Sequence, residues 1–65
     1  MLKIIEVLAE SNESWEDAAQ QAVITAGKSL RNIRSIYIKN FEAKVEDNQI
    51  VEYRINGQIS FELTE

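Results

Sequence analysis

The most constraining feature of this chain is a strict alternation of apolar and polar residues near its C-terminal end. Between positions 51 and 63 the odd positions are apolar or glycine and the even ones are polar: Val51, Tyr53, Ile55, Gly57, Ile59, Phe61 and Leu63 alternate with Glu52, Arg54, Asn56, Gln58, Ser60 and Glu62. A period of two is typical of an antiparallel strand with one buried face and one face that meets solvent or a ligand. The segment therefore predicts a strand whose odd-numbered side must be covered.

A helix is predicted upstream of this strand. From Trp15 onward, apolar side chains recur at a spacing of 3.6 residues as far as Ile33. Ser14 and Asp17 resemble a capping box at the start of this helix. Basic residues suit the negative end of the helix dipole, so the pattern predicts that the helix continues past position 30 and closes with Lys28, Arg31 and Arg34.

Two more strands complete the predicted order. Residues 2–8 are rich in Leu, Ile and Val, on both parities, which indicates a short first strand covered on both faces. In the middle strand the apolar parity changes, from Ile36 and Ile38 to Phe41, Ala43 and Val45. A β-bulge near positions 39–40 would keep both groups on one side, and residues 46–49 form the hairpin turn. We expect an α+β fold, β-α-β-β, in which a three-stranded antiparallel sheet wraps around one helix.

The predicted lengths do not match. Hairpin arms of about 13 to 15 residues reach roughly 45 Å, whereas a helix of about 18 residues is only ~27 Å long. Phe41, Val45 and Val51 therefore need cover that one helix cannot give. A second copy of the chain is the simplest source, and the alternative is a monomer whose hairpin curls fully around the helix. Because the chain has 65 residues and no Cys or His, disulfides and thiolate zinc sites cannot stabilise it, which also favours an oligomer.

Composition narrows the classes of function. The net charge is −4, with 11 acidic and 7 basic residues, which disfavours nucleic acid as a partner. No apolar run approaches the roughly 18 residues of a membrane span, and the first residues lack a signal-peptide pattern, so we expect one cytoplasmic domain over residues 1–65. With no His or Cys, and with Gly27 and Gly57 isolated, neither a nucleophilic triad nor a phosphate loop is present. We expect no enzyme.

The chain resembles the dodecin family along nearly its whole length. The resemblance rests on Ser11 and an acidic lead into the helix, and then on four segments in matching order: 15–18 (WEDA), 30–33 (LRNI), 51–54 (VEYR) and 59–63 (ISFEL). It is similar in particular to a subgroup with a "SWEDA … AKVEDNQIVEYR" pattern. The resemblance implies a hollow homododecamer built from trimers, in which the hairpin wraps the helix.

The resemblance also points to a flavin site whose key positions are changed. Flavin-binding dodecins stack the isoalloxazine ring on a Trp at the start of the middle strand. They hydrogen-bond the flavin with a Gln that directly follows the Tyr of the last strand. The matching positions here are Ser35 and Arg54. Ser35 cannot stack on a ring, and Arg54 keeps donors but loses the acceptor of Gln and adds a fixed charge. The resemblance therefore implies an altered cofactor pocket at Ser35 and Arg54, which lie on strands that in relatives meet at a symmetry-related pocket of the oligomer.

Two functions from different classes stay open. The leading hypothesis is a small-ligand binding or storage shell, with flavin (riboflavin or FMN) held in a rebuilt pocket. The competing hypothesis is a structural or interaction shell that binds only ions, such as Mg²⁺ or Ca²⁺, or no ligand. Glu52 or Glu62 could gather at a symmetry axis for such ions, or could be solvated surface charge. Arg54 could pair with Glu52 or Glu42 and act structurally.

Two single residues have competing interpretations. Trp15 is expected to be a core or interface anchor, and the alternative is a flavin stacker relocated from position 35. Gly57 lies on the core side of its strand, where we expect it to permit close approach of the Ala-rich helix rather than of a ligand.

Overall fold

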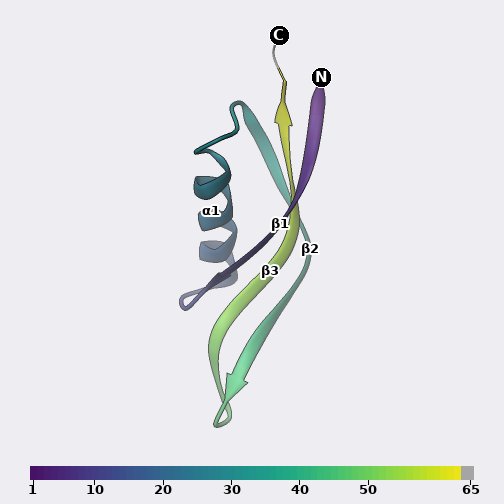
Figure 1. Ribbon diagram of the computed structural model, residues 1–65. Coiled ribbons are helices and arrows are strands. Elements are labelled where there is room, and N and C mark those ends of the chain that lie inside the picture. Colours follow the sequence, from purple (N-terminus) through teal and green to yellow (C-terminus); the bar gives the residue numbers. More distant parts are fainter. Residues whose placement is uncertain (64–65) are drawn as a thin grey trace.

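The computed structural model describes residues 1–63 and has the predicted order β-α-β-β (Figure 1). The elements are β1 (Leu2–Ser11), α1 (Trp15–Ala26), β2 (Ile33–Glu46) and β3 (Gln49–Glu62). The strands form one sheet in the order β1-β3-β2, and both pairings are antiparallel. Figure 1 shows α1 beside the upper part of the sheet and the β2–β3 hairpin continuing well beyond it. The expected α+β fold is confirmed.

Bulges allow the long hairpin to keep its apolar residues on one side. The register of β2 against β3 shifts between Ile33 and Ser35, between Ile38 and Asn40, and between Lys44 and Val45. The second shift is the bulge predicted from the change of parity. It brings Phe41 opposite Ile55, so the even and odd apolar groups of β2 share a face. Asp47 and Asn48, with φ of 52° and 65°, form the two-residue turn that the right-handed strand twist favours.

The start of α1 is held by three polar side chains. Ser14 is the N-cap, and its Oγ accepts a hydrogen bond from the Asp17 backbone N–H at 2.9 Å, as predicted. The Asp17 carboxylate does not complete the reciprocal half of a capping box by turning back to Ser14. Instead it accepts from the Ser11 hydroxyl at 2.6 Å. The end of β1 is thereby tied directly to the first turn of the helix.

The helix is shorter than predicted, because α1 ends at Ala26 and the expected closing residues Lys28, Arg31 and Arg34 lie outside it. Gly27 caps the helix, and Asn32 has a φ of 60°, a left-handed conformation that turns the chain toward the sheet. Ile33, the first residue of β2, then pairs with Phe61 of β3 instead of extending the apolar stripe of the helix. The 3.6-residue spacing of the apolar positions therefore overran the true end of the helix.

The core lies where α1 contacts the sheet. Its buried apolar residues are Ala18, Ala22, Ile55, Ile59 and Phe61. A 12-residue helix is about 18 Å long, whereas strands of 14 residues extend for roughly 46 Å. Four apolar side chains toward the hairpin turn stay 40–63% exposed: Phe41, Val45, Ile50 and Val51. The predicted mismatch between helix and hairpin is real, and larger than the sequence indicated.

Gly57 is required by a neighbouring strand and not by the helix. A Cβ on Gly57 would lie 2.5 Å from the backbone carbonyl oxygen of Tyr37, which belongs to β2. The nearest atoms all come from Tyr37 and Ile38, beside the bulge. The prediction that Gly57 makes room for α1 is therefore wrong, since the close approach is that of the bulged strand.

Candidate functional site

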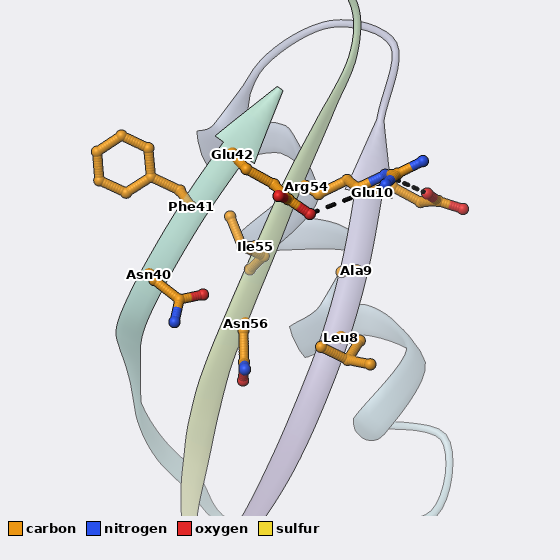
Figure 2. Close-up of a pocket in the computed structure, with 9 residues that line it drawn as sticks. All are labelled: Leu8, Ala9, Glu10, Asn40, Phe41, Glu42, Arg54, Ile55 and Asn56. Atoms are coloured by element: carbon orange, nitrogen blue, oxygen red, sulfur yellow. Dashed lines mark ion pairs between the residues drawn. The ribbon is translucent and has the colours of Figure 1, made fainter. Parts of the chain in front are cut away.

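A hollow of about 730 Å³ lies over the middle of the sheet (Figure 2). It receives residues from all three strands, and its lining consists of Leu8, Ala9, Glu10, Asn40, Phe41, Glu42, Arg54, Ile55 and Asn56. Because side chains alternate along a strand, Arg54 and Asn56 lie on the opposite face of β3 from the buried Ile55. The hollow is therefore chiefly a feature of the sheet face that α1 leaves open.

Arg54 is the centre of an ion-pair cluster at one end of this hollow. Its Nε lies 2.9 Å from Glu52 and 3.4 Å from Glu10, and its Nη1 lies 3.8 Å from Glu42. Glu10 and Glu42 are the direct cross-strand partners of Arg54 because β3 is the central strand. The predicted pairing with Glu52 and Glu42 is confirmed. Glu10 was missed, although its even position in the first strand places it on the same face.

The cluster perturbs two titrations. The guanidinium of Arg54, which donates a hydrogen bond to Glu52, holds the pKa of that carboxyl below its ordinary value. The same hydrogen bond, with the charges of Glu52, Glu10 and Glu42, raises the pKa of Arg54. Glu10 and Glu42 are exposed and Glu52 and Arg54 are only half-buried, so the cluster orients the side chains more than it stabilises the chain.

Ser35 lies elsewhere on the sheet. Its hydroxyl forms a hydrogen bond of 2.5 Å with the hydroxyl of Ser60, its cross-strand partner. Ser60 and Arg54 are six residues apart on β3, which corresponds to roughly 20 Å along the strand. Ser35 and Arg54 therefore do not meet within one chain. A pocket that used both positions would have to combine residues from different copies, and their role in binding stays a prediction.

Trp15 is an internal anchor between α1 and the hairpin. Its indole Nε1 donates a hydrogen bond to the backbone carbonyl of Glu42 at 2.9 Å. Its ring meets those of Phe41 and Tyr53 edge to face, with centroids 5.1 Å and 4.9 Å away. These contacts favour the role of an anchor over that of a relocated flavin stacker, because the indole N–H already has an acceptor and the ring already packs against two aromatic side chains.

The acidic residues of the described part of the chain, 1–63, do not form a metal site on their own. Among residues 1–63 no group of three or more acidic side chains is arranged to hold a metal ion. The two candidates have partners in the same chain, since Glu52 accepts from Arg54 and Glu62 accepts from the N-terminal ammonium of Met1, both at 2.9 Å. A site for Mg²⁺ or Ca²⁺ would need carboxylates from neighbouring copies.

Within residues 1–63, no helix is both long and apolar enough to cross a membrane.

The fold and the hollow define a small α+β protein in which one helix covers one face of a long three-stranded sheet. The family model for dodecins matches residues 1–64. Calcium dodecin of Mycobacterium tuberculosis is 33% identical over 61 residues, which cover 94% of this chain and 86% of that protein. The chain belongs to the dodecin family.

Solved structures agree with this assignment. A point mutant of the dodecin of T. thermophilus superimposes with a TM-score of 0.93 at 28% identity, with 100% of this chain and 97% of the other covered. The crystal structure of calcium dodecin from Mycobacterium tuberculosis, described as having a novel calcium-binding site, gives a TM-score of 0.83 at 31% identity, with 98% and 91% covered. The predicted family is therefore confirmed.

Proposed function

We propose that this chain is one subunit of a hollow homododecameric shell, built from trimers, that binds or stores a small ligand of the flavin type (riboflavin or FMN) in an altered pocket. Each subunit contributes a single domain over residues 1–65 and performs no catalysis of its own. The observation that carries the proposal is the uncovered apolar end of the hairpin. Membership of the dodecin family supports the shell.

The case for self-assembly rests on exposed apolar surface at two places. Toward the hairpin turn, Phe41, Val45 and Ile50 are 63%, 59% and 50% exposed. On the open face of β1, outside the hollow, Leu2 and Ile4 are 57% and 60% exposed. In addition, β1 and β2 are the outer strands of the sheet, and each has an edge that pairs with no other strand of residues 1–63. A second copy of the chain offers apolar surface and strand edges of the same kind.

A second candidate function is a shell that holds only metal ions, or no ligand. The calcium-binding relative favours it, since it is 33% identical and covers 94% of this chain. Three carboxylates also surround Arg54 on the open sheet face: Glu10, Glu42 and Glu52. Ions would have to be held where carboxylates of several copies meet, because no such group exists within residues 1–63 of one chain.

Native mass spectrometry of the purified protein tests both candidates together. We expect one assembly of twelve 7.5 kDa chains, about 90 kDa, that gains mass on incubation with riboflavin. Mass gained with Ca²⁺ or Mg²⁺ and not with riboflavin would favour the ion-only shell. A single 7.5 kDa species at micromolar concentration would contradict the shell itself.

A further inference from the structure

The charges of the hollow are dominated by carboxylates. Glu10 and Glu42 line it beside Arg54, and Glu52 lies next to the same guanidinium. Lys44, the cross-strand partner of Glu52, adds a second positive charge opposite that carboxylate. The three carboxylates, Arg54 and Lys44 together carry a net charge of −1 at neutral pH. No lysine is among the lining residues. Arg54 is therefore the one cationic side chain of the lining, and it is outnumbered.

The guanidinium of Arg54 is also already engaged. Its Nε faces two carboxylates, Glu52 at 2.9 Å and Glu10 at 3.4 Å, and its Nη1 faces Glu42 at 3.8 Å. Figure 2 shows the carboxylates of Glu10 and Glu42 converging on Arg54 from the two outer strands. An entering anion would have to compete with these carboxylates for the guanidinium and would approach at least two like charges.

The rest of the hollow suits an uncharged ring. Asn40 and Asn56 are direct cross-strand partners, and both line it, so their amides offer donors and acceptors side by side. Leu8, which is 81% exposed, supplies apolar surface on the same face. A flat ligand with a hydrogen-bonding edge can meet these amides and the Leu8 side chain here without needing a counter-ion.

We propose that this hollow selects neutral or cationic ring ligands and rejects anionic ones, phosphorylated ligands included. The inference rests on the proposed small-ligand function and narrows its ligand class: of the two flavins considered, riboflavin fits and FMN does not. The three carboxylates around Arg54 are then the residues that determine specificity. Arg54 acts as the counter-ion of these carboxylates and does not bind the phosphate group of a ligand.

Three tricyclic probes separate charge from shape. Proflavine is cationic, riboflavin is neutral, and FMN carries the riboflavin ring with an added phosphate. Fluorescence titration of the assembled wild-type protein at neutral pH and low salt should give the strongest binding for proflavine. FMN should bind at least roughly tenfold more weakly than riboflavin, since charges a few Å apart at a protein surface interact strongly enough for that factor. Added salt should narrow the difference.

A matched pair of variants tests the residues. Glu42→Gln removes one charge from the hollow and should bring FMN closer to riboflavin while weakening proflavine. Glu46→Gln removes the same charge at the hairpin turn, outside the lining, and should leave the order unchanged. If wild-type protein binds FMN as tightly as riboflavin, the charge selection is wrong while the ligand-binding shell stands. If none of the three probes binds, the proposed small-ligand function fails, and the selection fails with it.

Discussion

The two ends of the β2–β3 hairpin have the same sequence pattern and very different surroundings. Near α1 the odd-numbered residues of β3 are buried, with Ile55 at 3% and Ile59 at 0% exposure. Toward the turn the pattern continues, yet Val51 is 40% exposed and Val45, on the facing strand, 59%. Figure 1 shows α1 beside the covered end, around Ile55 and Ile59, whereas the free end, around Val45 and Val51, extends beyond the helix.

This difference teaches that an alternating pattern specifies a need for cover without specifying its source. The sequence places apolar residues on one face along nearly the full hairpin, but a 12-residue helix covers only part of it. Exposed apolar surface of this extent marks an interaction site. The free end is therefore the part of the protomer that a neighbouring copy is expected to cover, and the covered end is the part that folds against the protomer's own helix.

The largest expected effect comes from the same substitution, Ile to Ala, made once at each end of the hairpin. Ile59→Ala at the covered end should cost about 2–5 kcal/mol of unfolding free energy, because it leaves a cavity under α1. Ile50→Ala at the free end, where the side chain is 50% exposed, should cost the protomer far less and should instead shift dissociation of the assembly to higher protein concentration. Urea denaturation and mass photometry on dilution measure the two effects. Equal losses in urea would remove the distinction between the ends.

A smaller effect is expected at the bulge that joins the two ends. Gly57→Ala would place a Cβ 2.5 Å from the Tyr37 carbonyl oxygen, and a strand backbone cannot move aside cheaply. We expect a loss of roughly 1–3 kcal/mol from overpacking. Gln58→Ala, at the neighbouring position on the open face, is the control and should cost less. Thermal unfolding of both variants measures these losses of stability. An unchanged unfolding midpoint for Gly57→Ala would show that the close approach of β2 to Gly57 is not needed.

The smallest effect concerns the charge cluster. Arg54 lowers the pKa of Glu52 in the folded protein, so this pairing stabilises the fold above the pKa of an unfolded glutamate, about 4.3. The stabilisation is lost as the pH falls from that value through the lower folded pKa. Glu52→Gln should therefore lose less stability than wild type between pH 6 and pH 3, as urea midpoints would show. Glu46→Gln is the control, and the same acid sensitivity in all three proteins would exclude a role for the pairing.

Much of the fold could be predicted because its signals are local. The alternation from Val51 to Leu63, the change of parity near Lys39 and the Ser14 cap each depend on a few neighbouring residues, and each has its expected counterpart in the structure. The end of the helix could not be read in this way. Leu30 and Ile33 fit a helical stripe, and only the left-handed Asn32 turns the chain away from it.

The candidate site was harder to predict because it depends on the order of strands. Arg54 was expected to pair with Glu42 and Glu52, both of which belong to the hairpin. Glu10 was missed because nothing local indicates that β1 pairs with β3. The family resemblance implies that Ser35 and Arg54 meet at a symmetry-related pocket between copies, and the distance between them along one sheet is known only once the register is known.

Sedimentation velocity tests most directly whether the free end of the hairpin is covered by other copies of the chain. Wild-type protein at micromolar concentration should sediment as one large assembly. A Val45→Asp, Val51→Asp variant, which places charge at the free end and leaves the covered core intact, should sediment as much smaller species. An unchanged assembly in the variant, or a 7.5 kDa wild-type protein, would contradict the account.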